Sequence, residues 1–80
     1  MAYLHIGGQY VLRRSAVAGI FDMENTTSSR ITRELLAAAE KNGEVINAAE
    51  DLPRSFILCE ENGERRVYLS QLSPAALSRR

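Results

Sequence analysis

The sequence has little of the side-chain chemistry on which enzymes and metal sites depend. It contains one cysteine and one histidine among 80 residues. It has no glycine-rich phosphate loop before a helix, and no nucleophile stands at motif spacing from a base. The carboxylates lie beside basic residues, in turns or on the outer face of a helix, where solvation explains them. We therefore expect a protein that is not an enzyme, with no cofactor, metal or small-molecule substrate.

Long apolar runs and paired cysteines are also absent. No stretch approaches the roughly 20 apolar residues that a membrane span needs, and the N-terminus lacks the charged start and apolar stretch of a secretion signal. The single cysteine, Cys59, lies inside the apolar run SFILC and has no partner for an internal disulfide. We expect Cys59 to be a core residue, and the protein to be cytoplasmic with no membrane partner.

Neither sign of charge is in excess. Ten Lys and Arg residues balance ten Asp and Glu residues, so no overall positive field indicates a nucleic-acid partner, and such binding would require local clusters. All the basic residues except Lys41 are arginine. Arginine suits bidentate contacts to carboxylate or phosphate, although a GC-rich genome explains the arginine content equally well.

Enough apolar residues are present for a folded domain, because the chain is 45% hydrophobic and 25% charged. We expect residues 1–80 to form a single domain. A chain of this length buries only about 60–65% of the surface that its unfolded form exposes, so its core is thin. Contacts with other subunits would add to its stability.

The N-terminal part predicts a hairpin followed by a third strand. The segments YLHI and YVLR flank Gly7-Gly8, a dipeptide that accepts a two-residue turn. Pairing about that turn places Tyr3 opposite Leu12, Leu4 opposite Val11 and His5 opposite Tyr10. We interpret His5 as a structural neighbour of an aromatic ring. The run at 16–22, AVAGIFD, predicts a buried strand.

The middle of the chain predicts one helix between a loop and a short strand. The loop at 23–29 is rich in residues that cap helix N-termini, and a cap is expected at Thr27, Ser28 or Ser29. The helix at 29–42 has one apolar stripe, and Gly43 is a stop signal. A short strand, EVIN, follows at 44–47. The residues of the stripe are Ile31, Leu35, Leu36, Ala38 and Ala39.

The C-terminal part contains the clearest local signal, the pair Asn62-Gly63 of a type I′ turn. The turn sets the register of a second hairpin, with Glu60 opposite Arg65, Cys59 opposite Arg66, Leu58 opposite Val67, Ile57 opposite Tyr68 and Phe56 opposite Leu69. Both faces are apolar, so these strands are central or lie in a subunit interface. Ser73-Pro74 predicts a short terminal helix. The fold class is α+β: a small, mostly antiparallel sheet with one main helix and a short C-terminal helix.

Arginines are the candidate functional residues. Arg13 and Arg14 follow the first hairpin with no carboxylate nearer in sequence than Asp22, and Arg54 begins a later strand. We expect these three at one edge of the sheet, as a surface for an anionic ligand. Arg65 is expected to pair with Glu60 across the hairpin, which leaves Arg66 as a fourth candidate. The terminal pair Arg79 and Arg80 is a weaker one.

The chain resembles the small bacterial extracellular-matrix regulators RemA and RemB over nearly all of its length, and it is closer to the RemB type. The resemblance rests on YLHIGGQYVL at the start, VAGIFD after the first hairpin, the helix ITRELLAAAEKNG and the long C-terminal stretch. Its most telling pieces are GIFD, PRSFIL and the ending YLSQLSPAALSRR.

The resemblance implies a DNA-binding transcriptional regulator of biofilm-matrix genes. It also implies a fold similar to LytTR-type DNA-binding domains, and a ring-shaped homo-oligomer that holds duplex DNA by arginines on its rim. The RemA-type arginines fall near Ala16, Asp51 and Leu52 in this chain, with Arg13, Arg14 and Arg54 close by. Two function classes therefore stay open: direct DNA binding, and regulation by a ring-forming protein through a protein partner.

Overall fold

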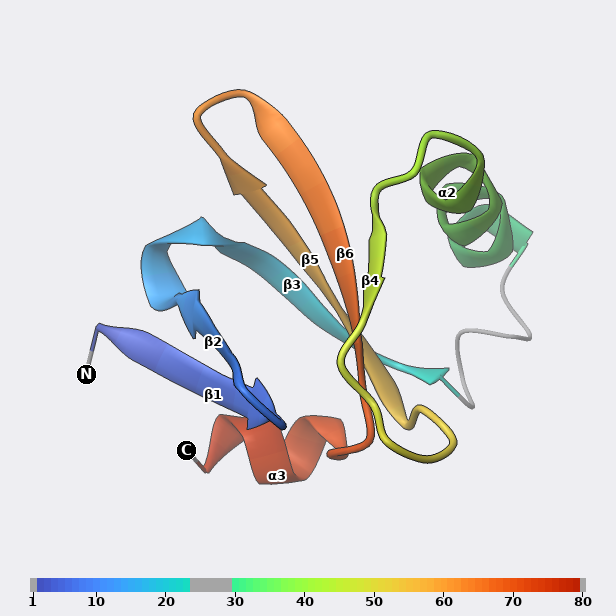
Figure 1. Ribbon diagram of the computed structural model, residues 1–80. Helices are drawn as coiled ribbons and strands as arrows, with labels where there is room; N and C mark the ends of the chain where they lie inside the picture. The colour runs from blue at the N-terminus through green and yellow to red at the C-terminus, as the bar shows by residue number, and fades with distance from the viewer. Residues whose placement is uncertain (1, 24–29, 80) are drawn as a thin grey trace.

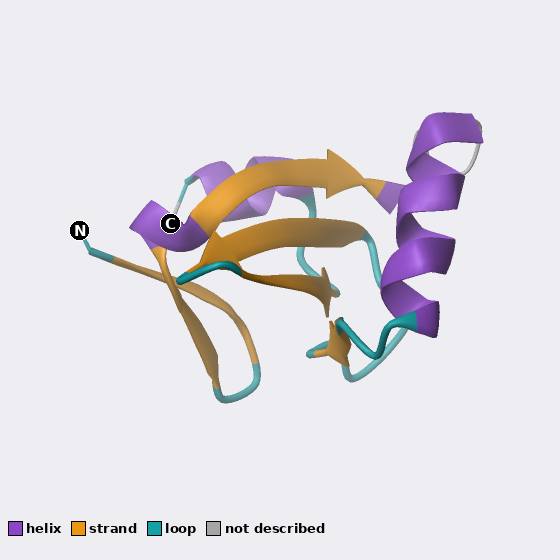
Figure 2. Ribbon diagram, turned by 90° about the horizontal axis from the view of Figure 1, so that it is seen from above, coloured by secondary structure: helices purple, strands orange, loops and turns teal. Residues whose placement is uncertain are grey.

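The computed structural model describes residues 2–23 and 30–79 as three layers, with a four-stranded sheet between α2 on one side and a hairpin with a short helix on the other (Figures 1 and 2). The elements in chain order are β1 (Tyr3–Gly7), β2 (Tyr10–Arg13), the 3-10 turn η1 (Arg14–Ala16), β3 (Val17–Asp22), α2 (Arg30–Lys41), β4 (Val45–Asn47), β5 (Ser55–Glu61), β6 (Glu64–Ser70) and α3 (Pro74–Ser78).

The sheet has the strand order β3-β5-β6-β4, and β1 and β2 form a separate two-stranded hairpin. The β3–β5 and β5–β6 pairs are antiparallel, whereas β4 runs parallel to β6 after the crossover through α2. This arrangement confirms the predicted α+β class, with one main helix and a short C-terminal helix.

The hairpin of β5 and β6 has the register that its turn predicts. Each of the five expected pairs, from Phe56 opposite Leu69 to Glu60 opposite Arg65, is present. Asn62 and Gly63 have φ angles of 55° and 79°. Both central residues of a type I′ turn require positive φ, which Asn and Gly accept at little cost.

Helix α2 ends where the sequence predicts. Gly43 has a φ of 69°, its N–H donates to Glu40, and the N–H of Glu44 donates to Ala39, which is the hydrogen-bond pattern of a Schellman motif. Leu35, Leu36 and Ala39 face the sheet, but Ala38 is exposed and does not belong to the stripe. The predicted caps at Thr27 to Ser29 and the side chain of Ile31 lie outside the described residues.

The central strands are buried on both faces. Phe56 and Val67 pack against α2 and form a buried cluster with Ala39 of that helix. Ile57 and Cys59 point to the opposite side. There the buried residues of the β1–β2 hairpin and α3 cover them: Leu4, Ile6, Leu12 and Leu77. The apolar character of β5 and β6 is therefore explained within one chain, and it is no longer an argument for a subunit interface.

The first hairpin differs from its prediction by one position. The two-residue turn is at Gly8 and Gln9, and a bulge lies between His5 and Gly7. Tyr3 consequently faces Arg13, Leu4 faces Leu12 and His5 faces Val11. His5 Nε2 lies 3.0 Å from the carbonyl oxygen of Gly8, so the ring contacts the turn.

Strand β3 is at the edge of the sheet, and its burial is lower than predicted. It pairs only with β5 among the described strands. Ala18 and Phe21 are exposed, and the other residues of the strand are half-buried. The apolar sequence indicated a buried strand because composition does not distinguish a central strand from an uncharged edge.

Two buried serines fasten the C-terminal part to the rest of the molecule. The hydroxyl of Ser70 donates to the carbonyl of Ile6 at 2.7 Å, and the hydroxyl of Ser55 donates to the carbonyl of Leu72 at 2.7 Å. Ser73 caps α3 by accepting from the N–H of Ala76 at 3.1 Å, as the Ser-Pro pair predicts. The bonds of Ser70 and Ser55 thus tie β1 and the segment that precedes α3 to the sheet.

Candidate nucleic-acid interface

Arg13 and Arg14 lie at the corner between the first hairpin and the sheet. Arg13 ends β2, and Arg14 begins the 3-10 turn that leads into β3. The side chain of Arg13 is 61% exposed, and its Nε lies 3.7 Å from a carboxylate oxygen of Glu61. The expectation that Arg13 lacks an ion-pair partner was wrong, because the partner comes from β5 and not from the neighbouring sequence.

Arg14 is different. Its backbone N–H donates to the carbonyl of Ala2 at 2.9 Å, which anchors the corner. Its guanidinium makes no ion pair with any residue that the structure describes. Arg14 is half-buried, and its positive charge lies in the 3-10 turn that precedes β3.

Arg65 and Arg66 are both neutralised, and neither pairs as predicted. Arg65 Nη2 lies 3.1 Å from Glu44 Oε1, although Glu60 is its cross-strand neighbour in the backbone register. Arg66 donates to Glu64 at 3.1 Å and to the carbonyl of Arg65 at 2.8 Å. The expectation that Arg66 has no partner was wrong, which weakens it as a contact for phosphate.

Arg54 lies at the other end of the sheet from Arg13. Its N–H donates to the carbonyl of Ser70 and its carbonyl accepts from the N–H of Met23, so the backbone is fixed between β6 and the end of β3. Arg54 precedes β5 and Glu61 is the last of its seven residues, so the two lie roughly 20 Å apart at about 3.3 Å per residue. The four candidate arginines therefore do not form one cluster in a single subunit.

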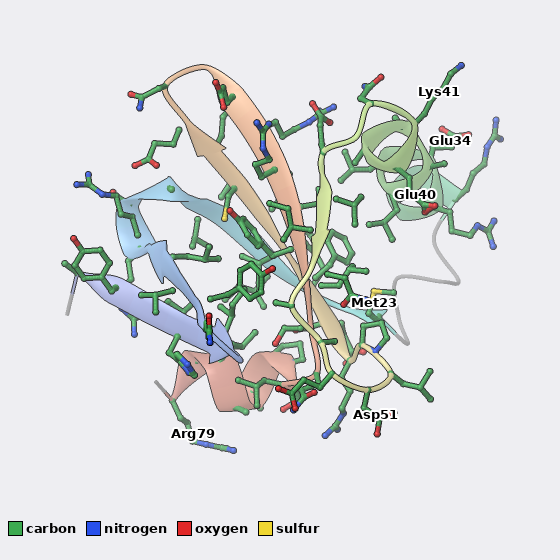
Figure 3. All side chains as sticks on the ribbon, viewed as in Figure 1. Met23, Glu34, Glu40, Lys41, Asp51 and Arg79 are labelled. Carbon is green, nitrogen blue, oxygen red and sulfur yellow. The ribbon has the colours of Figure 1, made fainter. Side chains whose placement is uncertain are left out.

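Arg54 and Arg79 are exposed, and neither makes an ion pair within the described ranges 2–23 and 30–79. Arg79 extends from the end of α3 away from the protein body (Figure 3). Arg14, Arg54 and Arg79 are consequently three arginines that make no ion pair among the described residues. Arg80 lies outside the described residues.

A cleft of about 440 Å³ lies between the two hairpins. Val11 and Arg13 line it from β2, Tyr68 and Arg66 line it from β6, and Cys59 lies on β5 among them. Its two arginines face Glu61 and Glu64, so its charges are balanced. A balanced cleft attracts a phosphate backbone less than the isolated Arg14 and Arg54 do.

Burial raises the pKa values of two side chains in the cleft, Cys59 and Tyr68. Desolvation, followed by the negative charge of Glu61, raises the pKa of the Cys59 thiol to about 11. Burial also raises the pKa of Tyr68, with a smaller contribution from Cys59. At neutral pH the thiol is protonated and is a poor nucleophile, which agrees with its assignment to the core.

Two kinds of feature are absent from the described residues. Within residues 2–23 and 30–79, no three His, Cys, Asp or Glu side chains gather into a possible metal site. In the same ranges, no helix has the length and apolar character needed to cross a membrane.

The family of the chain follows from comparison with known proteins. The model of the RemA-like family, described as extracellular matrix regulatory protein A-like, matches residues 3–80. The chain therefore belongs to this family, whose description assigns it to the regulation of extracellular matrix. A comparison with curated proteins gives no match.

Sequence reasoning missed the carboxylates that neutralise the arginines. Glu44 and Glu61 were assigned no role, and both come from elements remote in sequence from their partners. The Arg13–Glu61 pair depends on how one hairpin packs on the other, for which the sequence contains no local signal. The Arg65–Glu44 pair requires the parallel β4–β6 pairing, in which Val45 faces Val67.

Proposed function

We propose that this protein is a DNA-binding transcription regulator of extracellular-matrix genes, of the RemB type, that acts in the cytoplasm as a ring-shaped homo-oligomer. Membership of the RemA-like family supports regulation of matrix genes. The observation that carries DNA binding is the pair of arginines at the two ends of β3, Arg14 and Arg54, which have no ion-pair partner among the described residues.

One subunit alone would bind duplex weakly, because affinity grows with the number of phosphates that are neutralised. The net charge of the chain is zero, and two arginines separated by roughly the length of β5 contact few phosphates. An oligomer repeats Arg14 and Arg54 in every subunit. An oligomer therefore presents several copies of these arginines to the duplex, although its net charge stays zero.

The test is fluorescence anisotropy of a labelled duplex between about 50 and 200 mM salt. We expect the wild type to bind with a steep salt dependence, and Arg14→Ala/Arg54→Ala to bind at least tenfold more weakly at the lower salt. Each phosphate contact that is lost reduces the slope of log K against log salt by about 0.9. The oligomer mass of each protein is measured in the same buffer.

The matched control is Arg30→Ala/Arg65→Ala, which removes two arginines that are already paired with Glu34 and Glu44. We expect its affinity to remain within about threefold of the wild type. If both double variants lose affinity for DNA equally, binding depends on the net charge of the protein and not on Arg14 and Arg54. No binding by the wild type at 50 mM salt would reject direct DNA binding.

A second candidate is a ring-forming protein that regulates through a protein partner. The cleft between the hairpins favours it, because Tyr3, Tyr68 and two balanced Arg–Glu pairs suit a polypeptide better than a phosphate backbone. Failure of the wild type to bind DNA, together with retention of the oligomer, would favour this function.

A further inference from the structure

The edge of the sheet formed by β3 has no neighbouring strand among the described residues, although α3 contacts the strand. β3 is the last strand in the order, with β5 on one side and no described strand on the other. Its residues from Val17 to Phe21 include no charge and no proline. Soluble proteins commonly protect such edges with lysine, proline or very short strands, because an open row of N–H and C=O groups can pair with another chain. The opposite edge, β4, has only three residues.

The side chains beside this edge are apolar and exposed. Ala18 is exposed, and Phe21 is 36% exposed although it stacks on Phe56 with the ring centroids 4.7 Å apart. The ring of Phe21 also lies over Gly19, where an added Cβ would come within 2.8 Å of Phe21 Cε2. The edge thus presents exposed apolar side chains beside a backbone with no described partner strand, and its pairing with β5 has an irregularity between Val17 and Gly19.

The charges near the two ends of β3 are opposite. Arg14 begins the 3-10 turn that leads into the strand, and Asp22, which also takes part in an interaction within its own chain, is the last residue of the strand. In antiparallel pairing of two copies, the start of one β3 lies against the end of the other. Arg14 then lies near Asp22 of the partner subunit, and twofold symmetry forms this contact twice. Parallel pairing would bring like charges together.

From this complementarity we propose that the open edge of β3 pairs antiparallel with β3 of a second copy of this chain. The inference takes self-association from the proposed function and assigns it to a surface, but it does not depend on DNA binding. A pair of this kind closes on itself, so a ring requires a second contact elsewhere.

The pairing also brings together Arg14 and Arg54, which lie at opposite ends of the sheet within one subunit. The carbonyl of Arg54 accepts a hydrogen bond of 3.0 Å from the N–H of Met23, which places Arg54 at the end of β3. Arg14 of one subunit and Arg54 of the partner subunit then lie at the same end of the paired strands. Each end of the pair carries one arginine from each copy.

The experiment is a charge swap followed by analytical ultracentrifugation of the full chain at low salt. Arg14→Glu and Asp22→Arg each oppose like charges at two symmetric positions, and we expect each to raise the dissociation constant of self-association by about 10- to 100-fold. The double variant Arg14→Glu/Asp22→Arg restores both pairs and is expected within about threefold of the wild type. Arg79→Glu is the matched control, with the same charge change at an exposed arginine outside β3, and it should leave the constant unchanged.

Ala18→Lys adds an independent test, because it places a charge on the edge without touching Arg14 or Asp22. It is expected to weaken self-association as well, with an unchanged far-ultraviolet circular dichroism spectrum. A wild type that is monomeric at tens of micromolar, or a double variant as weak as the single ones, would overturn the proposal. DNA anisotropy separates it from the proposed function: a double variant with restored mass and reduced DNA affinity supports β3 pairing and shows that Arg14 also contacts DNA.

Discussion

The two hairpins of this protein each join two strands through a Gly-containing turn, but they have different positions in the fold. The β5–β6 hairpin is covered by α2 on one face and by the first hairpin and α3 on the other. The β1–β2 hairpin buries Leu4, Ile6 and Leu12 on one face and exposes Tyr3 and Val11 on the other. The hairpin with the stronger turn signal, Asn62-Gly63, forms the centre of the sheet. The hairpin with the weaker signal, Gly7-Gly8, covers one face of that sheet.

The burial of the two hairpins predicts a large difference in their sensitivity to truncation. Phe56 is fully buried and stacked on Phe21, so Phe56→Ala is expected to lower the free energy of unfolding by about 3–5 kcal/mol. Val11→Ala removes a side chain that is 53% exposed, and its expected cost is below about 0.5 kcal/mol. Urea unfolding followed by circular dichroism measures both changes. Equal costs would mean that the first hairpin is covered in solution, for example by another subunit.

The same comparison separates what the sequence could predict from what it could not. Asn62-Gly63 and Gly43 act within a few residues, and the register of β5–β6 and the end of α2 were predicted correctly. The bulge in the first hairpin was missed because two adjacent glycines allow the turn at more than one position. Its register is fixed by Leu4 and Leu12, which face each other and pack against the sheet.

The candidate site was less predictable than the fold. Arg13, Arg14 and Arg54 were identified from their positions near strand ends, and those positions were correct. The expectation that all three share one edge was wrong, because antiparallel pairing of β3 with β5 puts Arg14 and Arg54 at opposite ends of the sheet. Whether these arginines bind DNA stays a prediction.

The hydrogen bond between Ser70 and Ile6 links the two hairpins directly. Ser70→Ala would leave the carbonyl of Ile6, a fully buried residue, without this donor, and the expected loss of stability is about 1–3 kcal/mol. Ser78→Ala is the control, since Ser78 donates to the carbonyl of Pro74 at an exposed position and its loss should cost less than about 0.5 kcal/mol. If Ser70→Ala costs no more than Ser78→Ala in urea unfolding, the first hairpin does not depend on this bond.

Cys59 lies where the two hairpins meet, and its ionisation predicts a loss of stability at alkaline pH. Its pKa rises from 9.0 to about 11 on folding because burial disfavours the thiolate. Below pH 9 both states are protonated and the contribution of Cys59 is complete, whereas between pH 9 and 11 the unfolded state loses its proton first. Stability therefore falls across this window, by about 1–2 kcal/mol for this group.

Urea midpoints at pH 8 and pH 10.5 measure this loss in the wild type and in Cys59→Ala. Other groups titrate in the same range, including Tyr68, whose pKa is also raised. The difference between the two proteins isolates the thiol, and we expect the wild type to lose more stability than Cys59→Ala between the two pH values. Parallel losses in both proteins would show that Cys59 is as accessible in the folded state as in the unfolded state.

The smallest expected effect is at the ion pair between the hairpins. Arg13 and Glu61 connect β2 to β5, but their side chains are 61% and 47% exposed and the Nε–Oε2 distance is 3.7 Å. Solvent screens such a pair, so a double-mutant cycle with Arg13→Ala and Glu61→Ala should give a coupling of about 0.2–0.5 kcal/mol that disappears at high salt. The Arg65–Glu44 pair is the comparison, because its side chains are 37% and 19% exposed, its closest contact is 3.1 Å, and it lies within one sheet. Its coupling should be larger, up to about 1 kcal/mol, and less sensitive to salt. A coupling at Arg13–Glu61 that equals or exceeds that at Arg65–Glu44 would mean that the charged contact, and not the apolar layer beneath it, sets how the first hairpin is placed on the sheet.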